Sequence, residues 1–164
     1  MMPKSLIQIS LFFFIITFLS ATENIINLNN LSIQAKKENK HLLVYFHKFG
    51  CGFCEKMQER TLDDGDIETI IDQKFIFVDL GIDDEGIVVF KEFKGTKHDF
   101  AKSLEIDFYP SVGFIDGNRS IVYGVVGYRD KKTFEVILQY IYSGAYEKMD
   151  LEAFKTQLEF ENDE

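Results

Sequence analysis

The sequence has little or none of several residue types, and each shortage excludes a class of protein. Of its 164 residues none is tryptophan, two are proline and two are cysteine. Two cysteines are too few for a disulfide-rich scaffold or for a zinc site made of four cysteines. The 18 basic residues are outnumbered by 27 acidic ones, which gives a formal net charge of -9. A nucleic-acid-binding protein needs a basic face to displace counterions, so we expect no nucleic-acid partner.

Apolar residues are plentiful by contrast. Hydrophobic residues make up 46% of the chain, and the aromatic residues are 17 phenylalanines and 7 tyrosines. This composition supports a folded core rich in phenylalanine and excludes intrinsic disorder. The length fits one domain, which we expect to span residues 22–164.

Residues 1–21 have the pattern of an export signal. Lys4 supplies a positive charge, and a mostly apolar run of 14 residues follows from Leu6 to Leu19. The run is shorter than the ~20 residues of a spanning helix, and the small residues Ser20 and Ala21 offer a cleavage point. An uncleaved signal anchor that tethers the domain to a membrane is the alternative. Either interpretation predicts a periplasmic or otherwise extracytoplasmic location, where cysteines meet an oxidising environment.

The hydrophobic spacing after the signal predicts alternating helices and strands. Helices are expected over 31–39, from Cys51 to near Thr61, over 66–72, over 96–104, from Asp130 to Gly144 and from Asp150 onward; strands are expected over 41–46, 75–80, 111–116 and 121–126. Residues 24–30 are interpreted as a lead-in without structure. The acidic residues 83–85 lack the spacing of a calcium loop and predict a solvated turn. The order of elements predicts an α/β fold, a central mixed sheet flanked by helices on both faces.

Three local signals support these assignments. Thr96 and Asp99 have the spacing of a helix capping box. The residues 116–119, Asp-Gly-Asn-Arg, are typical of a tight turn between two strands. In the helix that starts at Asp130, apolar residues recur at helical spacing, and Gly144 stands where that helix should end.

The pair Cys51-Gly52-Phe53-Cys54 is the one motif that carries chemistry by itself. It lies between a predicted buried strand and a predicted helix, so Cys51 falls at the helix N-terminus, where backbone N–H groups favour a thiolate. Cys51 would attack a disulfide of another molecule, and Cys54 would resolve the mixed disulfide that forms. His47, Lys48 and Lys56 could add positive potential nearby, or simply be solvated.

Two other interpretations of the cysteine pair compete with redox chemistry. A zinc site would need two further ligands, for which the chain offers only His41, His47 and His98. A purely structural disulfide would close so small a loop that its stabilising effect would be slight. Redox chemistry is the interpretation we favour, with no bound metal and no other cofactor.

These residues resemble the thioredoxin superfamily, and most closely its exported thioredoxin-like branch. The resemblance covers about residues 30–160 and rests on four features, which are the strand 42–46, the Cys-Gly-Phe-Cys-Glu-Lys-Met motif at 51–57, the segment Tyr109-Pro110-Ser111, and Gly127. It implies a thioredoxin-like fold. It also implies that Pro110 is a cis proline facing the disulfide and that Tyr109 offers its backbone to an extended substrate. Phe53, together with Phe49, would add an apolar rim, although a place in the core is the alternative for both.

The chain also departs from thioredoxin in ways that bear on function. Tyr45 stands where thioredoxin has a buried aspartate that helps to move the proton of the second cysteine. Proton transfer from Cys54 would then depend on Glu55, Lys56 or water, or be slower. The dipeptide between the cysteines is Gly-Phe instead of Gly-Pro. The long segment 81–97 is similar to an insertion in periplasmic thioredoxins of the sulfur-oxidation type, which act as reductants.

The resemblance therefore implies an exported thiol–disulfide oxidoreductase that reduces disulfides of extracytoplasmic proteins. Its expected partners are protein substrates with thiols or disulfides and a membrane electron donor, and we expect a monomer. Two alternatives remain at this stage. One is a disulfide oxidase or isomerase with the same chemistry. The other is a non-catalytic binding module on which the disulfide is passive.

Overall fold

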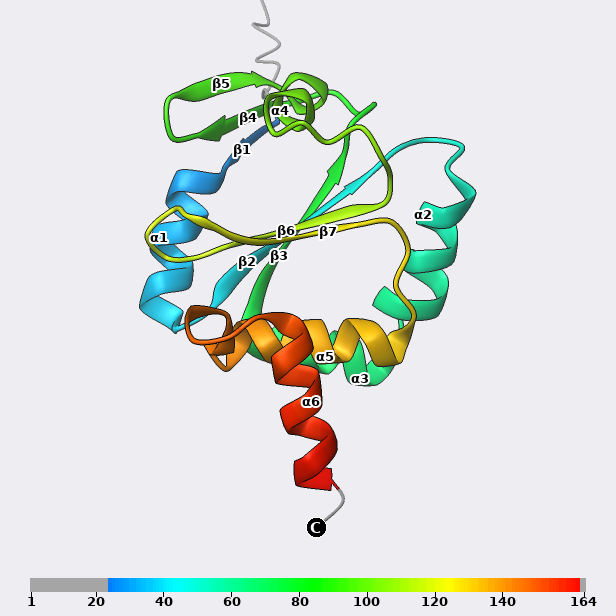
Figure 1. The fold of residues 1–164 in the computed structure, drawn as a ribbon. Coiled ribbons are helices and arrows are strands. Elements are labelled where there is room, and N and C mark those ends of the chain that lie inside the picture. The colour runs from blue at the N-terminus through cyan, green and yellow to red at the C-terminus, as the bar shows by residue number, and fades with distance from the viewer. Residues whose placement is uncertain (1–23, 163–164) are drawn as a thin grey trace, which may run out of the picture.

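A mixed four-stranded sheet forms the centre of the protein. The computed structural model describes residues 24–162. The sheet contains β2 (His41–His47), β3 (Phe75–Gly81), β6 (Ser111–Ile115) and β7 (Ile121–Val126), in the spatial order β3-β2-β6-β7 (Figure 1). Strand β2 runs parallel to β3, whereas β6 runs antiparallel to both of its neighbours, β2 and β7.

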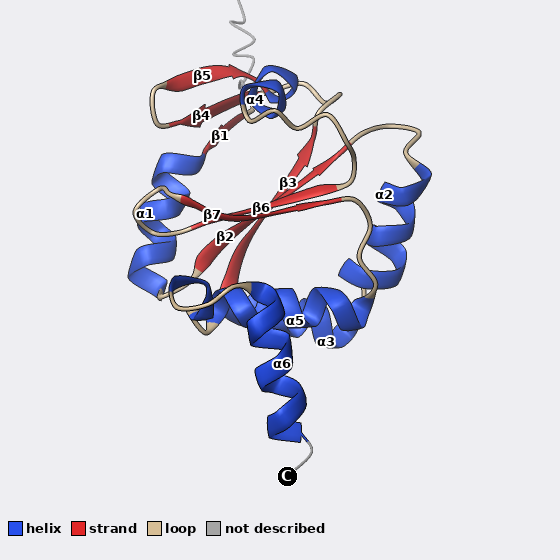
Figure 2. Ribbon diagram, viewed as in Figure 1, coloured by secondary structure: helices blue, strands red, loops and turns tan. Residues whose placement is uncertain are grey.

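Helices cover both faces of this sheet (Figure 2). The helices α1 (Leu28–Glu38) and α4 (Lys97–Ser103) pack on one face. On the other face lie α2 (Gly52–Met57), α3 (Gly65–Lys74) and α5 (Lys131–Tyr142). The predicted α/β class, with helices on both faces of a mixed sheet, is confirmed.

Strand β2 is buried on both faces, as its continuous apolar run predicts. Because successive side chains point to opposite faces of a strand, Leu43 and Tyr45 enter the core under α3 and α5. Leu42, Val44 and Phe46 enter the second core under α1 and α4. The strand thus lies between the two cores and ends just before the cysteine pair.

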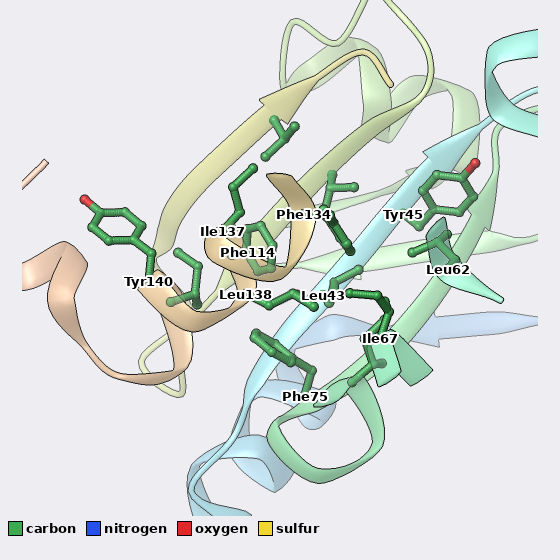
Figure 3. Close-up of a cluster of buried hydrophobic side chains, with 14 of the residues drawn as sticks. Leu43, Tyr45, Leu62, Ile67, Phe75, Phe114, Phe134, Ile137, Leu138 and Tyr140 are labelled. Atoms are coloured by element: carbon green, nitrogen blue, oxygen red, sulfur yellow. The ribbon is translucent and has the colours of Figure 1, made fainter. Parts of the chain in front are cut away.

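The first core is rich in aromatic residues, as the composition predicts. Phe114 of β6 and Phe134 of α5 are fully buried in it, and Phe75 at the start of β3 packs on Phe114 with ring centroids 5.7 Å apart (Figure 3). Apolar residues of α3 and α5 fill the space around these rings. Side-chain packing therefore fixes α3 and α5 against the sheet.

The N-terminal interpretation was wrong for residues 24–30. Ile25–Asn27 form the short strand β1, and α1 begins at Leu28, three residues before the predicted start. The side chain of Asn27 accepts a hydrogen bond of 3.0 Å from the backbone N–H of Asn30. Asparagine is a favoured N-cap, so the asparagine-rich composition marks a helix start here and not a lead-in.

The segment 81–97 contains two strands that the sequence pattern did not predict. β4 (Ile87–Phe90) and β5 (Phe93–Thr96) form a hairpin, and β4 also pairs in parallel with β1. Together they make a second sheet of order β1-β4-β5. Each strand has only four residues, too few to show a clear periodicity. The predicted solvated turn at 83–85 is confirmed, since all three residues are exposed.

The predicted turn and cap residues are confirmed. Thr96 caps α4 by accepting from the N–H of Asp99 at 3.0 Å. Asp116 holds the β6–β7 turn through the N–H groups of Asn118 and Ser120. Gly144, with a φ of +73°, follows the end of α5.

Three further elements complete the described part of the chain. The π-helical turn η1 (Gln58–Leu62) extends α2, and the 3-10 turn η2 (Ala145–Glu147) follows α5. The last helix, α6 (Leu151–Asn162), projects away from the body of the fold (Figure 1). Over residues 24–162, none of the helices has the length and apolar character needed to span a membrane.

The aromatic core predicts a large difference between two phenylalanines. Phe134→Ala removes a fully buried ring and should lower the free energy of unfolding by about 3–5 kcal/mol. Phe160→Ala, on α6, removes a ring that is 71% exposed and should change it by less than about 0.5 kcal/mol. Urea unfolding of the oxidised variants measures both. A loss below about 1 kcal/mol at Phe134 would contradict the described packing.

Candidate active site

The two cysteines lie at the start of α2, shortly after the end of β2. The loop 48–50 connects the two elements, and Gly50 makes its turn with a φ of +67°, which glycine adopts without steric cost. Cys51 and Cys54 form a disulfide, with their Cα atoms 5.2 Å apart. The helix from Cys51 predicted by the sequence is present, with Cys51 as its N-cap residue.

The two sulfur-bearing residues differ in exposure. Cys51 is partly exposed, whereas Cys54 is only 4% exposed. The backbone N–H of Cys54 donates a hydrogen bond of 3.2 Å to the Sγ atom of Cys51. Hydrogen bonding of this kind stabilises a thiolate, so the geometry favours Cys51 as the reactive sulfur when the pair is reduced.

Pro110 follows a cis peptide bond, as the resemblance implies. The carbonyl oxygen of Tyr109 lies 3.7 Å from the Sγ atom of Cys51, so the backbone just before the proline borders the accessible sulfur. The carbonyl oxygen of Pro110 accepts a hydrogen bond of 2.7 Å from the N–H of Gly127. The structure therefore brings three predicted features together, namely the disulfide, Tyr109-Pro110 and Gly127.

Exposed aromatic side chains occur in the segments that carry these features. Phe53 is 64% exposed and Phe49 is 95% exposed, so a place in the core is wrong for both. Phe108, which sequence reasoning missed, is 72% exposed directly before Tyr109. An apolar cleft of about 240 Å³ lies beside Phe108 and is lined in part by Val126. Phe108 and Val126 thus form an apolar surface at this cleft, and Phe49 and Phe53 are exposed apolar side chains within and next to the cysteine motif.

The three positive groups near the motif have separate partners. The Nε2 atom of His47 lies 2.5 Å from Oδ1 of Asp79. The Nζ atom of Lys48 lies 5.5 Å from the ring centroid of Tyr109, and that of Lys56 lies 4.4 Å from the ring centroid of Tyr128. Both lysines are therefore placed for cation–π contacts.

Histidine placement gives no support for a zinc site. His41, at the other end of β2 from His47, makes a hydrogen bond of 3.1 Å with the hydroxyl of Tyr146. Within residues 24–162, no group of three or more histidine, cysteine or acidic side chains is arranged to hold a metal ion.

With this geometry established, similarity to known proteins decides the family. The family model of the thioredoxin-like domain matches residues 28–142, which is more than half of the chain. The chain belongs to the thioredoxin-like family. A Cys-X-X-Cys pair joined as a disulfide at the start of a helix in this fold is the arrangement of a thiol–disulfide oxidoreductase.

Solved structures support the same fold for this thioredoxin-like chain. A thioredoxin-fold protein from Helicobacter pylori is similar with 22% identity and a TM-score of 0.63, over 74% of this chain and 81% of that one. A thioredoxin from Thermus thermophilus has 18% identity and a TM-score of 0.56, over 73% and 86%. The oxidoreductase DsbH has 12% identity and a TM-score of 0.55, over 87% and 95%. No curated protein matches the chain significantly.

Two side chains of the thioredoxin-like domain hold the cysteine loop, a role that sequence reasoning assigned to neither of them. The hydroxyl of Tyr45 donates a hydrogen bond of 3.0 Å to the carbonyl oxygen of Cys54. The carboxylate of Asp83 accepts a hydrogen bond of 2.9 Å from the backbone N–H of Phe49. The acidic turn 83–85 is thus exposed, as predicted, and also anchors the loop. Its signal in the sequence is only its composition, which cannot show this contact.

Three ionisable groups near Cys54 have shifted pKa values, namely Tyr45, His47 and Asp79. Burial raises the pKa of Tyr45 to about 12, so this phenol stays protonated and remains a donor. The hydrogen bond with Asp79 raises the pKa of His47, against the opposing effect of burial. The same hydrogen bond lowers the pKa of Asp79.

The predicted export segment, residues 1–21, lies outside the described residues.

The His47–Asp79 pair predicts a stability that depends on pH. The pKa of His47 is raised above its ordinary 6.5 on folding, so its contribution is complete below that pH and is lost as the pH rises through the raised value. The pKa of Asp79 is lowered, so its contribution is lost only in acid. We expect His47→Gln to lower the free energy of unfolding by less than about 1 kcal/mol at about pH 5.5 and to have a smaller effect at about pH 9.

Urea unfolding across this pH range measures the effect, and Asp79→Asn provides the matched variant. In an Asp79→Asn background the pH dependence of the His47→Gln effect should change, because the largest cause of the raised pKa of His47 is gone while burial, Asp84 and Lys97 still act on it. An effect of His47→Gln that grows toward alkaline pH would contradict the pairing.

Proposed function

We propose that this protein is an exported thiol–disulfide oxidoreductase that reduces disulfides of extracytoplasmic proteins. The observation that carries the proposal is the asymmetric cysteine pair, with partly exposed Cys51 beside the Tyr109 carbonyl and buried Cys54 behind it. An attacking thiol must reach a partner's disulfide, whereas a resolving thiol needs to reach only its neighbour. Cys51 is accordingly the nucleophile and Cys54 the resolving thiol.

The reaction transfers two electrons from the dithiol to the substrate. The thiolate of Cys51 attacks one sulfur of a substrate disulfide, a mixed disulfide forms, and the other substrate sulfur leaves as a thiol after taking up a proton. Cys54 then attacks the Sγ atom of Cys51, which releases the second substrate thiol and leaves the Cys51–Cys54 disulfide. The disulfide seen in the structure is the oxidised end of this cycle.

Export and electron supply complete the proposal. Residues 1–21 have the pattern of a signal peptide, which supports a periplasmic or otherwise extracytoplasmic location for a single domain over 22–164. A reductant in an oxidising compartment must itself be reduced again after each turnover. We propose a membrane electron donor for this step, and a monomer as the working form.

The proposed roles of the two cysteines predict different effects of their substitution. Cys51→Ser should abolish the reduction of insulin disulfides, followed by turbidity with dithiothreitol as electron source. Cys54→Ser should also lose turnover. When this variant is reduced beforehand and separated from dithiothreitol, it should accumulate a mixed disulfide with the substrate, visible on a non-reducing gel, because attack still occurs while resolution does not. Full activity of Cys51→Ser would sink the assignment.

We further expect the substrate polypeptide to dock at Phe53, Tyr109 and Pro110. Phe53→Ser removes an exposed ring beside the disulfide and should raise the KM for insulin by about tenfold. A tenfold change corresponds to the burial of only part of an aromatic ring against the substrate. The rate with oxidised glutathione, which is too small to cover the ring, should change little. Phe160→Ala, which is exposed on α6 far along the chain, is the control. An equal loss with both substrates would contradict a docking role.

A further inference from the structure

A cleft beside the buried cysteine contains a histidine–aspartate pair. The cleft has a volume of about 380 Å³, and its lining includes Cys54, Tyr45, His47 and Asp79. One side of the cleft is lined by residues near the ends of β2 and β3, and residues of α2 and η1 line the other side. The buried sulfur-bearing residue and the imidazole therefore share one space that can hold water.

The imidazole of His47 is held in one orientation. Its Nε2 atom is bound to the carboxylate of Asp79, and its ring stacks on the ring of Tyr45 with centroids 5.1 Å apart and planes inclined by 20°. Tyr45 is itself fixed, because it is 2% exposed and its hydroxyl donates to the carbonyl oxygen of Cys54. Because Asp79 binds Nε2, Nδ1 is the other ring nitrogen that could take up a proton.

Cys54 needs a proton acceptor when it resolves a mixed disulfide. A free thiol has an ordinary pKa of about 8.5, and burial of a thiol disfavours the thiolate further. Tyr45 cannot accept this proton near neutral pH, because burial raises its pKa to about 12. Glu55 and Glu59 also line the cleft, but both are exposed on the helix surface and have no partner that orients them toward Cys54 in the described contacts.

We propose that His47, positioned by Asp79, takes the proton of the Cys54 thiol through water in this cleft when the mixed disulfide is resolved. The inference rests on the proposed thiol–disulfide exchange. The proton passes to Nδ1 as the sulfur of Cys54 forms its bond to Cys51, and the bond from Cys51 to the substrate sulfur breaks. The electron pair of that bond leaves with the substrate thiolate. The imidazolium then gives its proton to solvent, and the reverse steps apply when the disulfide is reduced.

The charges around His47 agree with this role. Hydrogen bonding to Asp79 raises the pKa of His47 above its ordinary value, and Asp84 acts in the same direction, whereas burial and Lys97 oppose them. The other charged groups that line the cleft are Lys48, Glu55 and Glu59. A base whose pKa lies near the ambient pH combines availability with driving force for proton transfer.

The test separates the two half-reactions of the reduced, full-length chain with oxidised glutathione as the disulfide. In the Cys54→Ser background, release of the first glutathione thiol reports attack by Cys51 alone. In the protein with both cysteines, release of the second thiol reports resolution by Cys54. His47→Gln should slow resolution at about pH 7 by tenfold or more and leave attack within about threefold.

The pH profile distinguishes proton transfer from a structural effect. Resolution by the unmodified protein should show an inflection above the ordinary imidazole pKa of 6.5. This inflection should be absent from His47→Gln, where only the alkaline rise of the thiol itself remains. Asp79→Asn should keep the inflection but move it to lower pH, since the charge that raises the pKa of His47 is lost. His98→Gln, an exposed histidine of α4, is the matched control and should leave the profile unchanged.

Two results would overturn the inference. One is an unchanged rate and pH profile of resolution in His47→Gln, and the other is an equal slowing of attack and resolution, which would indicate a disturbed loop. An unmodified protein that releases no glutathione thiol at all would instead overturn the proposed function on which the inference depends.

Discussion

Burial of strand β2 on both faces is the constraint on which the rest of this structure depends. Leu43 and Tyr45 belong to one core, and Val44 and Phe46 to the other, so the strand cannot shift by one residue without exchanging the two sets. The cysteine loop, which follows β2 directly, therefore has a fixed position at the end of this strand. The same alternation sends Tyr45 and His47 to the side on which Cys54 is buried, where the two rings stack. Packing far from the disulfide thus sets the geometry beside it.

Elements with strong local signals could be predicted from the sequence. The buried strand 41–46, the strand 75–80, the amphipathic helix after Asp130 and the turn at 116–119 all follow from hydrophobic spacing or turn chemistry, and all are present. The position of the cysteine pair at a helix start follows from a strand that ends just before it. The cis bond before Pro110 could be expected only from the family resemblance, because spacing alone says little about peptide-bond isomers.

Features that depend on contacts between distant segments could not be predicted. Strand β1 has three residues and pairs with β4, some sixty positions away, so neither shows a period of its own. The anchoring of Phe49 by Asp83 and the pairing of His47 with Asp79 join segments more than thirty residues apart. The sequence alone pointed to Glu55, Lys56 or water as proton acceptors for Cys54, because these follow the motif. The sheet register instead brings Asp79 of β3 opposite Tyr45 of β2, and with it the histidine that the pattern treated as a nearby charge.

The most direct test of the account is the reduction potential of the Cys51–Cys54 pair, measured by equilibrating the protein with glutathione buffers of defined ratio and trapping free thiols. A reductant of extracytoplasmic disulfides should equilibrate readily and give a value near that of thioredoxin, about −270 mV. A value near about −120 mV, in the range of strong oxidants, would contradict the reducing direction. A pair that stays oxidised in every buffer would contradict redox function altogether.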